Sequence, residues 1–169
     1  MATPTDRDDA VQKLAAMIKD IEVAMLTTVD ADGTLRSRPM ITQKTDFDGD
    51  LWFFTHADAP KVDEVRRAEK INLSYAAPDK QRYVSVSGTA RLVRDRAQAE
   101  QLWHPFLRAW FPDGLDDPNL GLLKVSVERA EYWDSPSSSV VHLVGFVKAL
   151  ASGQSYKPGE NEKVDLASD

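Results

Sequence analysis

Six short apolar segments, each bounded by turn-forming residues, limit the fold of this sequence more than any other feature. The turn DADG at 30–33 separates the first two segments, and the turn DFDGD at 46–50 precedes the third. This spacing predicts that the first three segments are successive antiparallel strands. Strands connected in this way, with few helices, favour a mostly β protein built on a small closed barrel over a parallel sheet. The predicted strands cover residues 23–29, 34–41, 51–55, 71–77, 83–93 and 121–133.

Helical patterns flank these strands. Apolar residues recur at three- and four-residue spacing between Val11 and Ile21, which predicts a first helix. Other segments read as helices at 60–70, at 95–111 with an interruption near Pro105, and at 137–150. We find no linker, so we expect one domain over residues 1–169, with a barrel over about 7–150 and a polar tail over 151–169.

Composition excludes several functional classes. A net charge of −6 argues against nucleic acid as a general partner, since binding to a phosphate backbone needs clustered lysine and arginine. The chain has no cysteine, hence no disulfide, thiolate nucleophile or thiolate metal site. No apolar run is long enough to span a bilayer, and the first residues are acidic where a secretory signal is basic. A cytoplasmic location is therefore the expectation.

Standard catalytic and metal-binding signatures are missing. There is no phosphate-binding P-loop, no G-x-G-x-x-G and no G-x-S-x-G, and DFDGD lacks the terminal acid of a calcium loop. His56 and Asp58 are near each other, but the other two histidines are distant in sequence. We therefore predict no metal site, and no residue stands out as a general acid or base.

The stretch LWFFTHADAPK at 51–61 has the chemistry of an anion site. Thr55 ends a strand, and Lys61 opens a helix, where unpaired backbone N–H groups and the helix dipole favour a negative group. A lysine at that position is mildly unfavourable unless an anion sits there. Thr55, Lys61 and the helix start could thus form a phosphate cradle, while a solvated loop lysine explains the pattern nearly as well.

Arginine and tryptophan add further candidates. Arg38 precedes Pro39 in SRPM, and a proline inside a strand places that strand at an edge, at a bulge or beside an opening. Arg38 could aim its planar guanidinium at a ligand there, or be solvated on the edge. Trp110 and Trp133 fall at the ends of elements, where an aromatic ring is often half exposed and able to stack.

These pieces occur together in an order that resembles one family. The segments are SRPM at 37–40, LWFFTHADAPK at 51–61, INLSYAAPDKQRYVSVSGTARLV at 71–93, LWHPFLRAWFPDGLDDPN at 102–119 and AEYWD at 130–134. They resemble the bacterial general stress proteins of the pyridoxamine 5′-phosphate oxidase-like superfamily, the FMN-binding split barrels. The resemblance implies a six-stranded antiparallel split barrel of Greek-key type, forming a homodimer with two flavin sites at the interface.

The resemblance also implies which residues lie at the FMN. The strand with the arginine would run beside the flavin, a hydroxyl residue would lie near the phosphate, and the lysine that opens the helix would bind it. A polar residue near the ring falls on Tyr83, and the partner subunit would supply aromatic residues. The implied cofactor-binding residues are Arg38, Pro39, Met40, Ile41, Phe54, Thr55, Lys61, Tyr83, Trp110 and Trp133.

The sequence departs from true pyridoxamine phosphate oxidases near its C-terminus. Those enzymes have an R-x-H element that grips the vitamin phosphate, whereas SPSSSVVHLVGF has His142 without an arginine two residues before it. The resemblance therefore does not extend to vitamin B6 oxidation. Lysine-rich positions for a deazaflavin are not evident, which leaves FMN as the expected cofactor.

Three functions remain open. The first is an FMN-dependent oxidoreductase that takes electrons from a nicotinamide donor. The second is a flavin-binding stress protein without turnover, acting as a sensor or interaction partner. The third is a barrel that has lost the cofactor and serves as a binding module, which the retained Arg38, Thr55 and Lys61 argue against.

Overall fold

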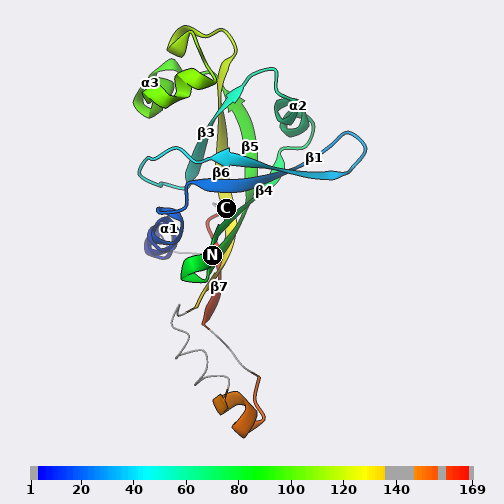
Figure 1. Cartoon of the computed structure of the whole chain (residues 1–169), viewed down its shortest axis with the longest axis vertical. Helices are drawn as coiled ribbons and strands as arrows, with labels where there is room; N and C mark the ends of the chain where they lie inside the picture. The colour runs from blue at the N-terminus through cyan, green and yellow to red at the C-terminus, as the bar shows by residue number, and fades with distance from the viewer. Residues whose placement is uncertain (1–3, 136–146, 156–158, 168–169) are drawn as a thin grey trace.

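The computed structural model describes residues 4–135, 147–155 and 159–167, and its centre is one antiparallel sheet that curls on itself (Figure 1). The strand order is β2-β1-β4-β5-β6-β3, and β7 pairs with the far part of β6. The strands are β1 Val23–Val29, β2 Leu35–Ile41, β3 Asp50–His56, β4 Lys70–Ala77, β5 Arg82–Val93, β6 Leu120–Asp134 and β7 Glu160–Asp165. The six expected strands are all present, with bounds within a residue or two of those predicted.

The expected pairing of β3 was wrong. β1 and β2 form the predicted hairpin, with Val29 opposite Leu35, but β3 pairs along its whole length with β6, so that Thr55 faces Gly121. The loop between β2 and β3 is too long to force a tight hairpin, and Pro39 in β2 removes a backbone donor. β2 is accordingly an edge strand, one of the three placements that its proline allowed.

The order β3-β6-β5-β4 is a Greek key. The strands β4, β5 and β6 follow one another as antiparallel neighbours, and β3, which precedes them in the chain, lies beside β6 rather than beside β4. The sheet curls far enough to bring its two edge strands together at one end, where the amide of Gln43 donates to the carbonyl of Trp52 at 2.9 Å. Within the described residues β2 and β3 form no ladder. The barrel is therefore split between them, which confirms the expected fold class.

Alternation along the strands sends one set of side chains inward. Leu26, Leu73, Val86 and Ala130 are successive cross-strand partners, and all are buried. The register shifts at Gly88, where a Cβ atom would lie 2.1 Å from the carbonyl oxygen of Ser126. Glycine is required at this bulge, because the close approach of β6 leaves no room for a side chain.

Helices cover the ends and the outside of the barrel. Helix α1, Pro4–Ile18, packs Leu14, Met17 and Ile18 into the core, and helix α2, Pro60–Arg67, buries Val62 and Val65. Between β5 and β6 lies a separate lobe at the top of Figure 1, made of α3 Arg96–Leu102 and the short 3-10 helices η2 Pro105–Ala109 and η3 Gly114–Asp116. No helix within the described ranges is long and apolar enough to cross a membrane.

The C-terminal segment differs from the expectation of a polar tail. Its residues 160–165 form β7, which is polar but pairs with β6 from Arg129 to Asp134. Leu166, next to the strand, is buried in the main core. A largely polar strand suffices here because backbone hydrogen bonds and two apolar residues, Val164 and Leu166, hold it. Most of the helix expected over 137–150 lies outside the described residues.

Candidate functional site

The start of α2 is a helix end without a side-chain cap. Ala59 occupies the N-cap position and has no side chain that could accept a hydrogen bond from the first turn. Pro60 has no N–H and its fixed φ favours the first helical position, so the sequence APK begins the helix here. The amide of Val62 bonds back to the carbonyl of Ala59 at 2.9 Å. The first turn thus leaves a partial positive charge beside Lys61.

Lys61 is half-buried at this helix start. Burial lowers the pKa of its ammonium group below 10.5, the positive charge of Arg38 lowers it further, and Glu64 acts in the opposite direction. No carboxylate of the described residues lies within ion-pair distance of it. A cation that pays for desolvation without a protein counter-ion is suited to an external anion.

Thr55 lies at the end of β3, on the inner side of the strand. Its side chain is buried, and its hydroxyl donates a long bond of 3.3 Å to the carbonyl of the neighbouring His56. Such a bond is weak, so this hydroxyl can exchange it for a better acceptor. The structure thus places Thr55 at the end of β3 and Lys61 at the start of α2, and their grouping around one anion stays a prediction.

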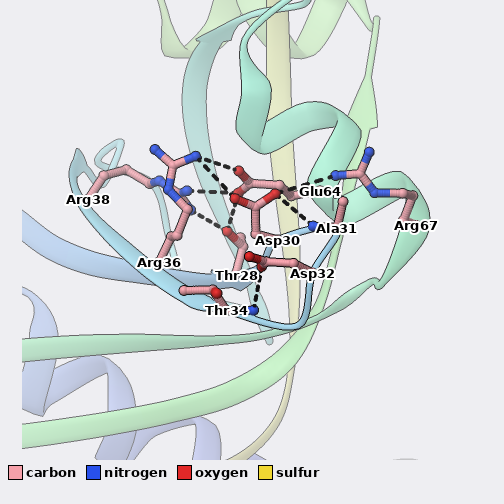
Figure 2. A network of polar contacts seen from close by, with 9 residues as sticks. All are labelled: Thr28, Asp30, Ala31, Asp32, Thr34, Arg36, Arg38, Glu64 and Arg67. Carbon is pink, nitrogen blue, oxygen red and sulfur yellow. Dashed lines mark hydrogen bonds and ion pairs between the residues drawn. The ribbon is translucent and has the colours of Figure 1, made fainter.

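Arg38 is held by the protein itself. Its Nη2 donates to Glu64 Oε2 at 2.7 Å, and its Nη1 donates to Thr28 Oγ1 (Figure 2). Thr28 in turn donates to the same carboxylate, and Arg36 Nη1 lies 3.3 Å from Glu64 Oε1. Both terminal nitrogens of the Arg38 guanidinium thus donate hydrogen bonds within the protein. The role of Arg38 toward a cofactor stays a prediction.

Glu64 is the centre of this network, and sequence reasoning missed it. Its side chain is 2% exposed, and it reaches from α2 toward the β1–β2 hairpin. Burial raises the pKa of Glu64, but hydrogen bonds from Thr28 and Arg38 and the charges of Arg38 and Arg36 outweigh it, so the pKa lies below 4.5. Its position one helical turn after Lys61 was the available signal, since both then lie on one side of α2.

A looser ring of charges surrounds the hairpin turn. Asp30 Oδ1 accepts from the amide of Ala31 at 2.6 Å, and the Asp30 carboxylate lies 3.7 Å from Arg36 and 4.0 Å from Arg67. These pairs are exposed and long, so each contributes little to stability. They nevertheless connect the hairpin tip to the end of α2 opposite Lys61.

Asn119 fixes the loop between β3 and α2. Its carbonyl accepts from the amide of Ala57 at 2.8 Å, its side-chain oxygen accepts from the amide of Asp58 at 3.2 Å, and its amide nitrogen donates to the Asp58 carboxylate at 2.8 Å. The same nitrogen lies 3.3 Å from His56 Nδ1, and the His56 ring packs on Phe111. His56 and Asp58 are therefore engaged in holding the loop that separates Thr55 from Lys61.

The remaining predicted residues of β2 and β3 do not share one surface. Arg38 and the buried Met40 face the inside of the sheet, whereas Pro39 and Ile41 are exposed on the outside. Phe54 packs against Trp103 and Phe111 of the lobe, with ring centroids 5.9 and 6.2 Å apart. A ligand along β2 would thus meet the free backbone edge of the strand more than its side chains.

Tyr83 and Trp133 lie at the other end of the molecule. They are cross-strand partners, and both are exposed. Twelve residues of β6 separate Trp133 from Gly121, the partner of Thr55, which corresponds to about 40 Å along an extended strand. Trp110 is exposed in the lobe near the Thr55 end. One chain therefore does not bring Lys61, Tyr83 and Trp133 together.

The sheet is antiparallel and curls into a barrel that stays open between the edge strands β2 and β3, and a helix with a lysine at its start follows β3. These features define the split-barrel class. The chain belongs to the pyridoxamine 5′-phosphate oxidase-like family, whose model matches residues 9–157. The resemblance inferred from the ordered motifs is thereby confirmed.

Two curated relatives extend this finding. The chain is 32% identical over 161 residues to protein bli-3 of Neurospora crassa. The alignment covers 89% of this chain and 75% of the relative. It is 26% identical over 147 residues to general stress protein 26 of Bacillus subtilis, covering 82% and 98%.

Solved structures show the same fold. A general stress protein 26 from Jannaschia sp. CCS1 matches with a TM-score of 0.72 at 23% identity, covering 94% of this chain and 99% of that one. The general stress FMN/FAD binding protein of Xanthomonas citri matches with a TM-score of 0.66 at 29% identity, covering 78% and 92%.

Proposed function

We propose that this protein binds FMN, with the phosphate at Lys61, Thr55 and the first turn of α2. The observation that carries the proposal is the half-buried Lys61, which has no ion-pair partner among the described residues and lies at an uncapped helix start. The similar protein from Xanthomonas citri is described as FMN/FAD binding, which supports a flavin.

The electrostatics favour a phosphate monoester. Such a group carries about −1.5 to −2 charges at neutral pH, more than either phosphate of an internal pyrophosphate linkage. Lys61, the helix start and the nearby Arg38 oppose this charge, while Glu64 already offsets much of Arg38. FMN ends in a monoester and FAD does not, so FMN suits this site better.

A homodimer would complete the site. Val23, Met25, Ile41, Tyr83 and Trp133 are all 40% exposed or more on one outer face of the sheet, and a group of exposed apolar side chains suits an interface with another protein surface. Because Tyr83 and Trp133 lie far from Lys61 in one chain, they could reach its flavin only from a second copy. This arrangement would put two flavins at one interface.

Bound FMN would supply electron transfer, and we propose a nicotinamide as electron donor with an acceptor of unknown identity. The chain would hold the phosphate through Lys61 and Thr55 and offer the free backbone edge of β2 to the ring. A flavin-binding protein without turnover is the second candidate. It is favoured because His56 and Glu64, the titratable groups near the site, are already engaged by Asn119 and by Arg38.

The visible absorption spectrum of the purified protein, with and without added FMN, tests the proposal. We expect a protein-bound flavin spectrum, and a loss of FMN affinity of about 10- to 100-fold in Lys61→Ala, the equivalent of one charge-assisted bond. Lys44→Ala is the matched control, since Lys44 is an exposed lysine paired with Glu22 at 3.2 Å. Unchanged affinity in Lys61→Ala would remove the proposed phosphate site.

Turnover is measured separately, as oxidation of NADH or NADPH by the FMN-loaded protein. Oxidation that requires bound FMN supports the oxidoreductase. Tight FMN binding without reduction by either nucleotide selects the second candidate.

A further inference from the structure

An open cleft with arginine walls lies at the opposite end of α2 from Lys61. It has a volume of about 670 Å³ and runs between the last turn of α2 and the end of β5. Four of its lining residues are arginines and one is a glutamate, which gives three net positive charges in a protein of net charge −6. The lining residues are Val65, Arg66, Arg67, Glu69, Ala90, Arg91, Leu92 and Arg94.

Structural roles explain only part of this cluster. Arg66 and Arg67 stand in the last turn of α2, where positive side chains stabilise the helix dipole. Their ion pairs are weak, because Arg66 lies 3.4 Å from the exposed Asp63 and Arg67 lies 4.0 Å from Asp30. Both guanidinium groups can therefore turn toward a ligand at little cost.

Arg91 and Arg94 have no such explanation. Arg91 is exposed on β5 directly opposite Lys124, a pairing of like charges that destabilises a sheet. Lys124 is compensated by Asp50 at 2.7 Å, whereas no carboxylate in the described part of the chain pairs with Arg91. Arg94 contacts the carbonyl of Pro118 at 3.1 Å, which leaves its charge without a counter-ion there.

The floor of the cleft is apolar. Val65 and Ala90 are buried, and Leu92 is partly buried between the arginines. A volume of this size lies within the range of about 300–1,000 Å³ found for small-molecule sites. Guanidinium groups bind phosphate oxygens in pairs, and several around one cleft match several adjacent phosphates.

From this geometry we propose that the cleft binds a small oligophosphate, either as the phosphate chain of a nucleotide or as an inorganic oligophosphate. The site is separate from the proposed FMN phosphate site and does not depend on it, since the length of α2 lies between Lys61 and Arg66. Because the arginines stand on both α2 and β5, we expect a ligand with two or more linked phosphates to contact more of them than a single phosphate can.

Isothermal titration calorimetry of the full chain with inorganic tripolyphosphate, inorganic pyrophosphate, ADP and AMP tests this proposal. We expect tripolyphosphate or ADP to bind and AMP to bind at least tenfold more weakly. The double variant Arg91→Gln/Arg94→Gln should lower the affinity by about 100-fold, with each arginine contributing about tenfold. Arg129→Gln is the control, because Arg129 is an exposed strand arginine outside the cleft.

The arms of the experiment separate the sources of phosphate. Tighter binding of ADP than of inorganic pyrophosphate assigns a nucleotide, and equal binding assigns the phosphate chain alone. Binding that persists in Lys61→Ala keeps this site distinct from the FMN site, whereas its loss there would overturn the assignment. Absence of binding to tripolyphosphate and to ADP would also overturn it, and so would an affinity of the double variant equal to that of the wild type. Preferential binding of a single-stranded oligonucleotide would replace it with a nucleic-acid surface.

Discussion

Lys61 and Arg38 are neighbouring cations beside the same helix, yet the protein treats them in opposite ways. The charge of Arg38 is strong enough at Lys61 to lower the pKa of the lysine. Arg38 has a buried carboxylate and a threonine as partners, whereas Lys61 has no carboxylate partner among the described residues. The difference teaches that the arginine joins α2 to the β1–β2 hairpin, while the lysine has no ion-pair partner among the described residues and is the cation that we propose for the phosphate.

Replacement of Glu64 should have the largest effect on stability, because Glu64 is the carboxylate that pairs with Arg38. We expect Glu64→Gln to lower the free energy of unfolding by about 3–5 kcal/mol, since Arg38 would then be partly buried without its counter-ion. Urea denaturation at pH 7 measures this, with the exposed Asp63→Asn as control on the same helix. A loss below about 1 kcal/mol, the range of surface pairs, would break the comparison.

Acid should remove the same stabilisation. The pKa of Glu64 is lower in the folded protein than its ordinary 4.5, so its contribution is complete above that pH and is lost as the pH falls through the folded pKa. The stability difference between the wild type and Glu64→Gln should therefore be constant from pH 7 to 5 and shrink below about 4.5. Urea midpoints at successive pH values test it; a difference that persists unchanged to pH 3 would show that Glu64 acts by packing.

Lys61 should have the smallest effect on the fold. Replacement by methionine keeps most of the side-chain volume and removes a desolvated charge, so we expect the unfolding free energy to change by less than about 0.5 kcal/mol, or to rise slightly. The measurement is the same urea titration without added flavin. A loss as large as that of Glu64→Gln would mean that Lys61 has a structural partner, and the contrast with Arg38 would disappear.

The strands and the helix start at Lys61 could both be predicted from local sequence. Alternating apolar residues and turn residues located the β1–β2 hairpin within a residue or two. A short loop leads from Thr55 into a helix that starts with Pro60, so local sequence places Thr55 at the end of a strand and Lys61 at the start of the next helix. Short-range geometry is enough for such conclusions.

The failures involve contacts between distant segments. β3 was expected beside β2 and pairs with β6, about seventy residues further along the chain. The four residues of β2 that were implied to lie beside the flavin, Arg38, Pro39, Met40 and Ile41, are divided between two faces, because a strand sends successive side chains to opposite sides; their role toward a flavin stays a prediction. Glu64 was not noticed, because a glutamate in a short helix usually faces solvent.

The sequence by itself determined the elements, limited β2 to an edge, a bulge or an opening, and placed Lys61 at a helix start, since each depends on residues within one turn or one strand. Only the tertiary structure decided that Glu64 is buried against Arg38, and that Tyr83 and Trp133 lie far from Lys61. The physical reason is that burial and charge pairing depend on which surfaces the curled sheet brings together. That arrangement depends on the whole chain, so a local sequence pattern does not predict it.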